Sequence, residues 1–200
     1  MSKTKKSDEK SKRILSAVKS ALVQRGYAGT TINRVAAEAG VSRGLLHYYF
    51  KNKEEMLATV IRENMQLAVL LVSDLLARST SAGDFARRLT TALRNVLQND
   101  PAFFHLFFEG WAVARQSTVV QATLEDLYGQ FRMAMADGLE KAQKNGTINP
   151  DLPVASVAIV LTGLVDGMGL QMITEPELAA DDAIWRDIAR SITGLLDSGG

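Results

Sequence analysis

The chain has 200 residues, of which 46% are hydrophobic and 22% are charged, a globular balance that excludes a wholly disordered or collagen-like chain. It contains no cysteine, which excludes a disulfide framework, a cysteine-based zinc or iron–sulfur site and a thiol nucleophile. The net charge of +1 hides an asymmetry, because residues 1–60 carry a net +7 and residues 61–200 a net −6. A basic first third indicates a polyanionic partner, although a tail that only keeps the chain soluble would have the same charge.

The chain is expected to fold as an all-α protein, because only four prolines interrupt a sequence rich in helix-forming residues. Capping residues, glycines and prolines divide it into about nine helices. The expected helices cover about residues 10–24, 31–39, 42–49, 52–76, 84–98, 101–111, 119–144, 152–173 and 182–196.

The basic residues at the start of the chain are expected to be unstructured, and whether they add phosphate or minor-groove contacts is left open. They are Lys3, Lys5, Lys6, Lys10, Lys12 and Arg13.

The apolar run at residues 152–173 is long enough to span a bilayer. We expect it to be a buried helix instead, because Asp166 lies inside it and its flanks have no basic cluster or aromatic belt.

Two short helices joined by Gly40 form the most informative segment, residues 31–57. Such a pair crosses steeply and leaves the second helix exposed on one side, which suits a DNA major groove. Arg43 and His47 are four residues apart and share a face, which is expected to be the outward one because Leu46 and Phe50 occupy the inward one. Ser42 and Gly44 lie at the helix start, where free backbone N–H groups attract phosphate.

The segment TTINRVAAEAGVSRGLLHYYFKNKEEML resembles the DNA-binding segment of the TetR family of bacterial transcription regulators. The resemblance rests on the paired threonines, the Ala-Gly-Val-Ser turn, the Gly-x-Leu-x-x-Tyr-Phe helix and the Lys-x-Glu start of the next helix. One residue departs from the family pattern, since His47 stands where the family usually has a tyrosine that touches DNA.

The resemblance implies a homodimer of all-helical subunits that binds a palindromic operator. It implies a DNA-binding domain at residues 1–51, with a basic tail at 1–10 and a helix-turn-helix at 31–50, and a ligand-binding and dimerisation domain at 52–200. Two grounds select the residues expected to touch DNA: the family position, and for Arg43 and Gly44 the chemistry described above. The full set is Thr31, Asn33, Ser42, Arg43, Gly44, His47, Tyr48, Tyr49 and Lys53. Arg43 is our choice for base reading, because arginine pairs bidentately with guanine.

The family architecture also implies a mostly apolar effector pocket, although aromatic runs are more often plain core. The candidate walls are Phe104, Phe107, Phe108, Trp111, Tyr128, Phe131, Met135, Met168 and Gln171. A dimer interface on the last two long helices is expected to use Gly163, Gly167, Trp185, Ile188, Ile192 and Leu195.

The function expected from these observations is a DNA-binding transcriptional regulator located in the cytoplasm, most simply a repressor released by a small apolar or aromatic ligand. An activator or a ligand-independent regulator of the same family is the alternative, and a helical-bundle enzyme or carrier is a more remote one. We expect no enzyme activity, cofactor or metal site, because no GxSxG, P-loop or GxGxxG motif is present and His105 with Glu109 supplies only two metal ligands.

Overall fold

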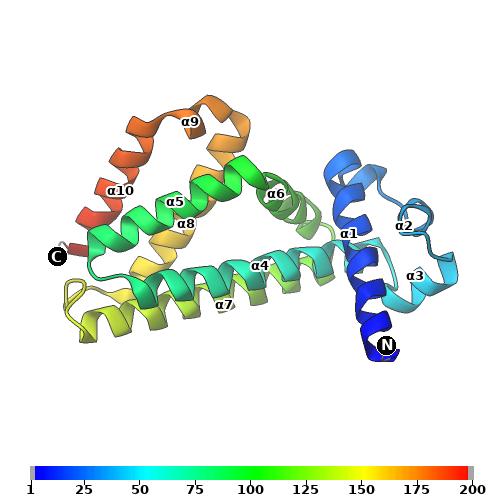
Figure 1. Cartoon of the computed structure of the whole chain (residues 1–200), viewed down its shortest axis with the longest axis horizontal. Helices are drawn as coiled ribbons and strands as arrows, with labels where there is room; N and C mark the ends of the chain where they lie inside the picture. The colour runs from blue at the N-terminus through cyan, green and yellow to red at the C-terminus, as the bar shows by residue number, and fades with distance from the viewer. Residues whose placement is uncertain (1–2, 198–200) are drawn as a thin grey trace. The chain divides into compact units, whose positions relative to one another are not determined.

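The computed structural model describes residues 3–197, with side chains from Glu9 onward, and it confirms the all-α prediction. The described residues form ten helices and no strand. The helices are α1 (Lys3–Gly29), α2 (Ile32–Glu38), α3 (Arg43–Tyr49), α4 (Lys53–Arg78), α5 (Ala82–Asn99), α6 (Ala102–Ala114), α7 (Thr118–Lys144), α8 (Val154–Thr174), α9 (Pro176–Ala180) and α10 (Asp182–Asp197) (Figure 1).

The first helix starts earlier than predicted, so the expectation of an unstructured basic tail is wrong for residues 3–10. The run from Lys3 to Lys12 contains no glycine or proline and continues the helix that buries Ile14, Val18 and Leu22. Met1 and Ser2 lie outside the described residues, as do the side chains of residues 3–8. Gly26, predicted to end the helix, interrupts it with φ 64° and ψ 176° before a last turn ending at Gly29.

Two other details differ from the prediction. The predicted helix at 84–98 begins earlier, at Ala82, and Ser81 caps it: the Ser81 hydroxyl accepts a hydrogen bond from the Asp84 N–H at 3.1 Å. The Asp84 carboxylate in turn accepts from the Thr80 N–H at 3.2 Å. The tenth helix is α9, a single short turn that begins at Pro176, where only a break between helices was predicted.

The described chain forms two compact units. The boundaries between them fall inside α4, α6 and α7, so each of these helices contributes residues to both units. The first unit comprises residues 1–64 and 105–125, and the second comprises residues 65–104 and 126–200. The predicted boundary between residues 51 and 52 stays a prediction.

In the first unit, α1, α2 and α3 pack together around a small apolar core (Figure 1). Ile14 and Val18 of α1, Val35 of α2 and Leu46 of α3 are each fully buried. This core fixes the three helices and leaves the outer face of α3 uncovered.

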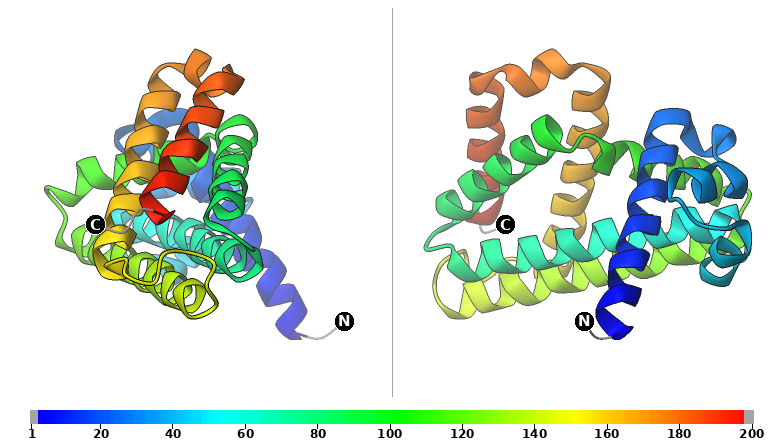
Figure 2. Two further views of the ribbon diagram at one scale, coloured as in Figure 1. Left: turned by 90° about the vertical axis from the view of Figure 1, so that its left-hand side faces the viewer. Right: turned by 45° about the vertical axis from the view of Figure 1, so that its right-hand side comes forward.

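In the second unit, α10 packs along α5, while α8 and α9 contact the same helix (Figure 2). Both α5 and α10 are strongly amphipathic and bury their apolar stripes in this contact. Trp185 of α10 is buried there, and its indole N–H donates to the Ala179 carbonyl at 2.9 Å. The apolar stripe of α10 therefore packs against α5 of the same chain, and its predicted use in a subunit interface stays a prediction.

Two helices, α4 and α8, are long and apolar enough to cross a membrane by length and composition alone. This is weak evidence, because the core helices of soluble proteins pass the same test.

Candidate functional site

The helix-turn-helix is held by local capping that the sequence signals. The Thr31 hydroxyl accepts from the Arg34 N–H at 3.4 Å, and the Ser42 hydroxyl accepts from the Leu45 N–H at 3.2 Å. Between the two helices Gly40 adopts φ 59°, a left-handed conformation that favours glycine. The Val41 N–H then donates back to the Ala36 carbonyl at 2.9 Å, which closes the turn.

The recognition helix α3 has the two faces that the sequence predicts. Leu46 is fully buried and Phe50, just past the helix end, is 4% exposed. Arg43, Gly44 and His47 are exposed on the opposite side. This face therefore presents a guanidinium, an imidazole and the exposed backbone of Gly44 at the start of the helix. The side chains suit the edge of a DNA base, and the backbone N–H suits a phosphate.

Arg43 and His47 contact each other directly. The Arg43 Nε–H donates to His47 Nε2 at 3.3 Å. This contact places the imidazole beside the guanidinium on the outward face of α3.

The remaining predicted DNA contacts differ in exposure. Thr31, Asn33 and Tyr48 are exposed, and the Tyr48 ring packs edge-on against Tyr49 at 5.7 Å between centroids. Tyr49 is half-buried, so part of its surface serves packing. Lys53 is the first residue of α4, and its ammonium lies 4.0 Å from the centre of the Tyr27 ring.

The predicted effector-pocket residues divide by burial. In the second unit Phe104 and Met135 are fully buried and Phe131 nearly so, while Tyr128 and Met168 are half-buried. In the first unit Phe107 is buried, Phe108 is half-buried and Trp111 is 51% exposed. Gln171 is exposed.

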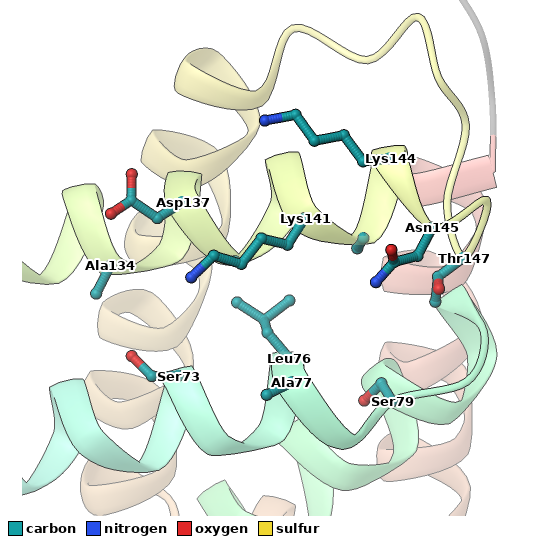
Figure 3. Close-up of a pocket in the computed structure, with 12 residues that line it drawn as sticks. Ser73, Leu76, Ala77, Ser79, Ala134, Asp137, Lys141, Lys144, Asn145 and Thr147 are labelled. Carbon is teal, nitrogen blue, oxygen red and sulfur yellow. The ribbon is translucent and has the colours of Figure 1, made fainter.

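A groove of about 450 Å³ lies between the carboxyl-terminal halves of α4 and α7 (Figure 3). It is mostly polar, with Ser73, Lys141 and Asn145 among its walls and the Leu76 side chain pointing toward α7. None of the predicted pocket residues lines it.

The one charged side chain of α8 is paired with a phenol. The Tyr128 hydroxyl donates to the Asp166 carboxylate at 2.6 Å. Burial raises the pKa of Asp166 above its ordinary value, and the hydrogen bond from Tyr128 opposes that rise. Tyr128, predicted as a pocket wall, thus also stabilises a half-buried carboxylate.

The predicted dimer-interface residues also divide into two groups. Trp185 is 6% exposed and Ile192 is 1% exposed, so both side chains pack within the chain's own core. Their place in a dimer interface stays a prediction. The sequence shows the apolar stripe of α10 but not that α5 covers it. Ile188 and Leu195 are half-buried.

Helix α8, in contrast, leaves an apolar face uncovered. Ile159 is 59% exposed, Val160 51% and Leu170 49%. A Cβ atom added at Gly163 or Gly167 would meet nothing within 4 Å, whereas one added at Gly169 would lie 2.2 Å from the Phe104 ring.

Two features of the site escape sequence reasoning. A carboxylate of α6, Glu109, accepts a hydrogen bond from the Tyr27 N–H at 2.7 Å, across 82 residues of sequence. The side-chain nitrogen of Asn64 is buried and has no hydrogen-bond partner. No local pattern signals either feature, because each depends on which distant element packs alongside. Among the described residues, no group of three or more His, Cys, Asp or Glu side chains is placed to hold a metal ion.

Comparison with known proteins covers both parts of the chain. Residues 14–60 match the family of bacterial regulatory proteins of the tetR family, and residues 82–197 match the BetI-type transcriptional repressor C-terminal domain. The uncharacterized HTH-type transcriptional regulator YfiR of Bacillus subtilis is 26% identical over 165 residues, which are 80% of this chain and 78% of that protein.

Solved structures share the fold. A putative TetR-family transcriptional regulator from Rhodococcus sp. superposes with a TM-score of 0.77 at 26% identity, covering 95% of this chain and 100% of that one. The regulator FadR from Bacillus subtilis, solved in complex with stearoyl-CoA, superposes with a TM-score of 0.73 at 18% identity, covering 94% and 98%.

The capped helix-turn-helix, its exposed recognition face and the match over both segments lead to one conclusion: the chain belongs to the TetR family and is a DNA-binding transcriptional regulator.

Proposed function

We propose that this regulator is a cytoplasmic homodimeric repressor, which binds a palindromic operator and releases it when a small apolar or aromatic molecule binds. The observation that carries the proposal is the recognition helix, whose exposed face bears Arg43 and His47 while Leu46 anchors it to the core. The net +7 of residues 1–60 supplies the electrostatic attraction to DNA. The match of residues 82–197 to a repressor domain favours repression over activation.

Base reading is assigned to Arg43, with its guanidinium oriented by His47. Phosphate contacts are assigned to the hydroxyls and backbone N–H groups at the two helix starts and to the outward aromatic and basic side chains. They are Thr31, Asn33, Ser42, Gly44, Tyr48, Tyr49 and Lys53.

Dimerisation is assigned to α8, with Ile188 and Leu195 of α10 at its margin. The uncovered side chains Ile159, Val160 and Leu170 are apolar, and the open space at Gly163 and Gly167 lets a second backbone approach closely. When two such faces pair symmetrically, a two-fold axis relates the two recognition helices. A palindromic DNA site has the same symmetry.

The effector site is assigned to the aromatic and methionine side chains of the larger domain. Phe104, Phe131 and Met135 form its buried part in the second unit, with Tyr128, Met168 and Gln171 beside them. Phe107, Phe108 and Trp111 of α6 belong to the first unit and stay pocket-wall predictions from the sequence. A protein of the same fold holds stearoyl-CoA, so this fold accommodates a long apolar ligand. Methionine side chains repack readily, which suits a site that adapts to ligands of varied shape.

The proposal is tested by selecting an operator from random duplex DNA and then measuring its affinity at several salt concentrations. We expect a palindromic consensus and an affinity that falls steeply with salt, because each dimer neutralises several phosphates. A library of apolar and aromatic compounds is then screened by tryptophan fluorescence and by operator release. Compounds that bind but leave operator affinity unchanged would contradict the release mechanism, and selection of no consensus would contradict specific DNA binding.

A further inference from the structure

Helix α1 is broken near its end, at Gly26, and the direction of the chain after this break leads into the helix-turn-helix. Gly26 adopts φ 64° and ψ 176°, so the helical hydrogen-bond pattern is interrupted there. The Gly26 carbonyl accepts from the Thr30 hydroxyl at 2.8 Å, and Thr31 begins the cap of α2 directly afterwards. Only five residues, 27–31, separate Gly26 from the start of α2, so the chain direction at Gly26 directly affects the direction of α2.

A side chain from another part of the sequence fixes this break. The Glu109 carboxylate of α6 accepts from the Tyr27 N–H at 2.7 Å. The same carboxylate lies close enough to Gly26 that an added Cβ would be 3.5 Å from its Oε1 atom. A carboxylate accepting from a backbone N–H is among the stronger hydrogen bonds in proteins. Half-burial of both residues limits competition from water.

The side chain of Tyr27 ties the same point to the start of α4. Its hydroxyl donates to the Glu54 carboxylate at 2.7 Å, and the Lys53 ammonium lies over its ring. Burial and the adjacent Glu54 carboxylate raise the pKa of Tyr27 above its ordinary range, while the hydrogen bond from Tyr27 lowers the pKa of Glu54. The phenol thus stays protonated and the carboxylate ionised, which keeps the contact intact. One residue, Tyr27, therefore meets α6 through its backbone and α4 through its side chain.

We propose that Glu109 is a positioning residue for DNA recognition: its carboxylate sets the direction of the chain at Gly26 and thereby the orientation of the helix-turn-helix. Glu109 itself touches no DNA in this proposal. It acts through the Tyr27 N–H, and its loss would widen the range of orientations that α2 and α3 sample. Operator binding needs one orientation, whereas binding to non-operator DNA depends mainly on phosphate charge and tolerates several.

The test compares three substitutions at Glu109 with a control at Glu63, an exposed glutamate of α4. Glu109→Ala removes the acceptor, Glu109→Asp keeps the charge on a side chain one methylene shorter, and Glu109→Gln keeps an amide oxygen at the same reach. The DNA probes are an operator duplex selected by the unmodified protein and a scrambled duplex of equal length. Circular dichroism on heating reports folding, and hydrogen exchange reports protection of the Tyr27 amide.

We expect Glu109→Ala and Glu109→Asp to weaken operator binding by about tenfold, equivalent to about 1.4 kcal/mol, and to change scrambled-duplex binding by less than about twofold. Glu109→Gln is expected to recover most of the operator affinity and the protection of the Tyr27 amide. Glu63→Ala is expected to leave both the operator affinity and the protection of the Tyr27 amide unchanged.

Unchanged operator affinity in a folded Glu109→Ala variant would overturn the proposal. So would an equal loss for both duplexes with no recovery by Gln, because that pattern indicates a general structural role. If Glu109→Ala does not fold, the comparison of Glu109→Asp with Glu109→Gln decides the question alone. The test requires no effector, so its failure leaves the proposed ligand release standing.

Discussion

The recognition helix α3 and the apolar helix α8 are both partly uncovered, but for opposite chemical reasons. The exposed face of α3 is polar, with Arg43, Gly44 and His47 outward over a buried Leu46. The exposed face of α8 is apolar, with Ile159, Val160 and Leu170 each about half exposed or more. Water solvates the first face well and the second poorly. The contrast separates two roles in the proposed dimer: the polar face of α3 is left for DNA, and the apolar face of α8 is the surface that a second subunit would cover.

The largest effect is expected where that second surface would approach most closely. Gly167→Leu has open space in the single chain, so it should leave the fold intact and obstruct only a neighbouring subunit. Overpacking costs about 1–3 kcal/mol per site, and a two-fold interface contains the site twice, so association should weaken by about 2–6 kcal/mol. Light scattering at micromolar concentration measures this directly. A variant that remains dimeric would remove α8 from the interface.

Gly169 lies on the same helix and provides the matched contrast. A Cβ atom there would lie 2.2 Å from the ring of Phe104, inside the chain's own core. Gly169→Ala should therefore reduce the free energy of unfolding by about 1–3 kcal/mol while leaving the subunit dissociation constant unchanged once folded. Urea unfolding with light scattering on the folded fraction separates the two effects. Equal stability of Gly169→Ala and Gly167→Ala would break the contrast.

On the polar side, Arg43→Ala should relax base preference at one position in each half-site. The expected loss is about 1–3 kcal/mol of discrimination at that position, because a bidentate arginine–guanine pair disappears. A scan of all single-base operator changes by fluorescence anisotropy measures it. Arg115→Ala, an exposed arginine outside the recognition helix, is the control for lost charge and should leave the base preferences as they are. The same scan on His47→Tyr tests whether the imidazole orients Arg43.

A smaller effect is expected at Asp166, the half-buried carboxylate of α8. Its pKa is raised in the folded protein by burial, so the folded state binds its proton more tightly than the unfolded state does. The contribution of Asp166 to stability should therefore be fully present below the ordinary pKa of 3.8 and be lost as pH rises through the raised value. Asp166→Asn should remove this decline. Urea midpoints between pH 4 and 7 check the sign, since an unchanged slope would remove Asp166 as its source.

The smallest effect is expected at Lys53. Its ammonium lies over the Tyr27 ring and also stands near the predicted phosphate path. Lys53→Ala should weaken operator and scrambled DNA alike and lower the salt dependence by about 1 phosphate per half-site. Titrations of both duplexes at three salt concentrations measure the slope. A loss confined to the operator would indicate a sequence-reading role instead.

Prediction from sequence succeeded where the deciding contacts are local. Thr31, Ser42 and Gly40 act within a few residues of themselves, so their cap and turn roles could be predicted before any fold was known. Sequence reasoning does not reach contacts that a distant element decides. The apolar period of α10 is equally compatible with α5 or with a second subunit, and only the tertiary packing assigns Trp185 and Ile192 to the core.

The prediction also differs from the structure at the start of the chain, where α1 begins at Lys3. The basic residues from Lys3 to Arg13 were expected to form an unstructured tail. They are helical because the adjoining turns of α1 are anchored by Ile14 and Val18, and an existing helix extends at low cost. The contact of Glu109 with Tyr27 has no sequence signal at all, since 82 residues separate the partners.

The division of labour within α3 bears on how such a regulator acquires new targets. The side chains that hold the helix in place, Leu46 and the neighbouring Phe50, are not the ones that face outward. Arg43, His47 and Tyr48 are solvent-exposed, and surface substitutions generally change folding stability by less than about 0.5 kcal/mol. Mutations at these three positions are therefore nearly free of a folding penalty. A duplicated gene could explore many operator sequences by changing them while the helix stays where Leu46 anchors it.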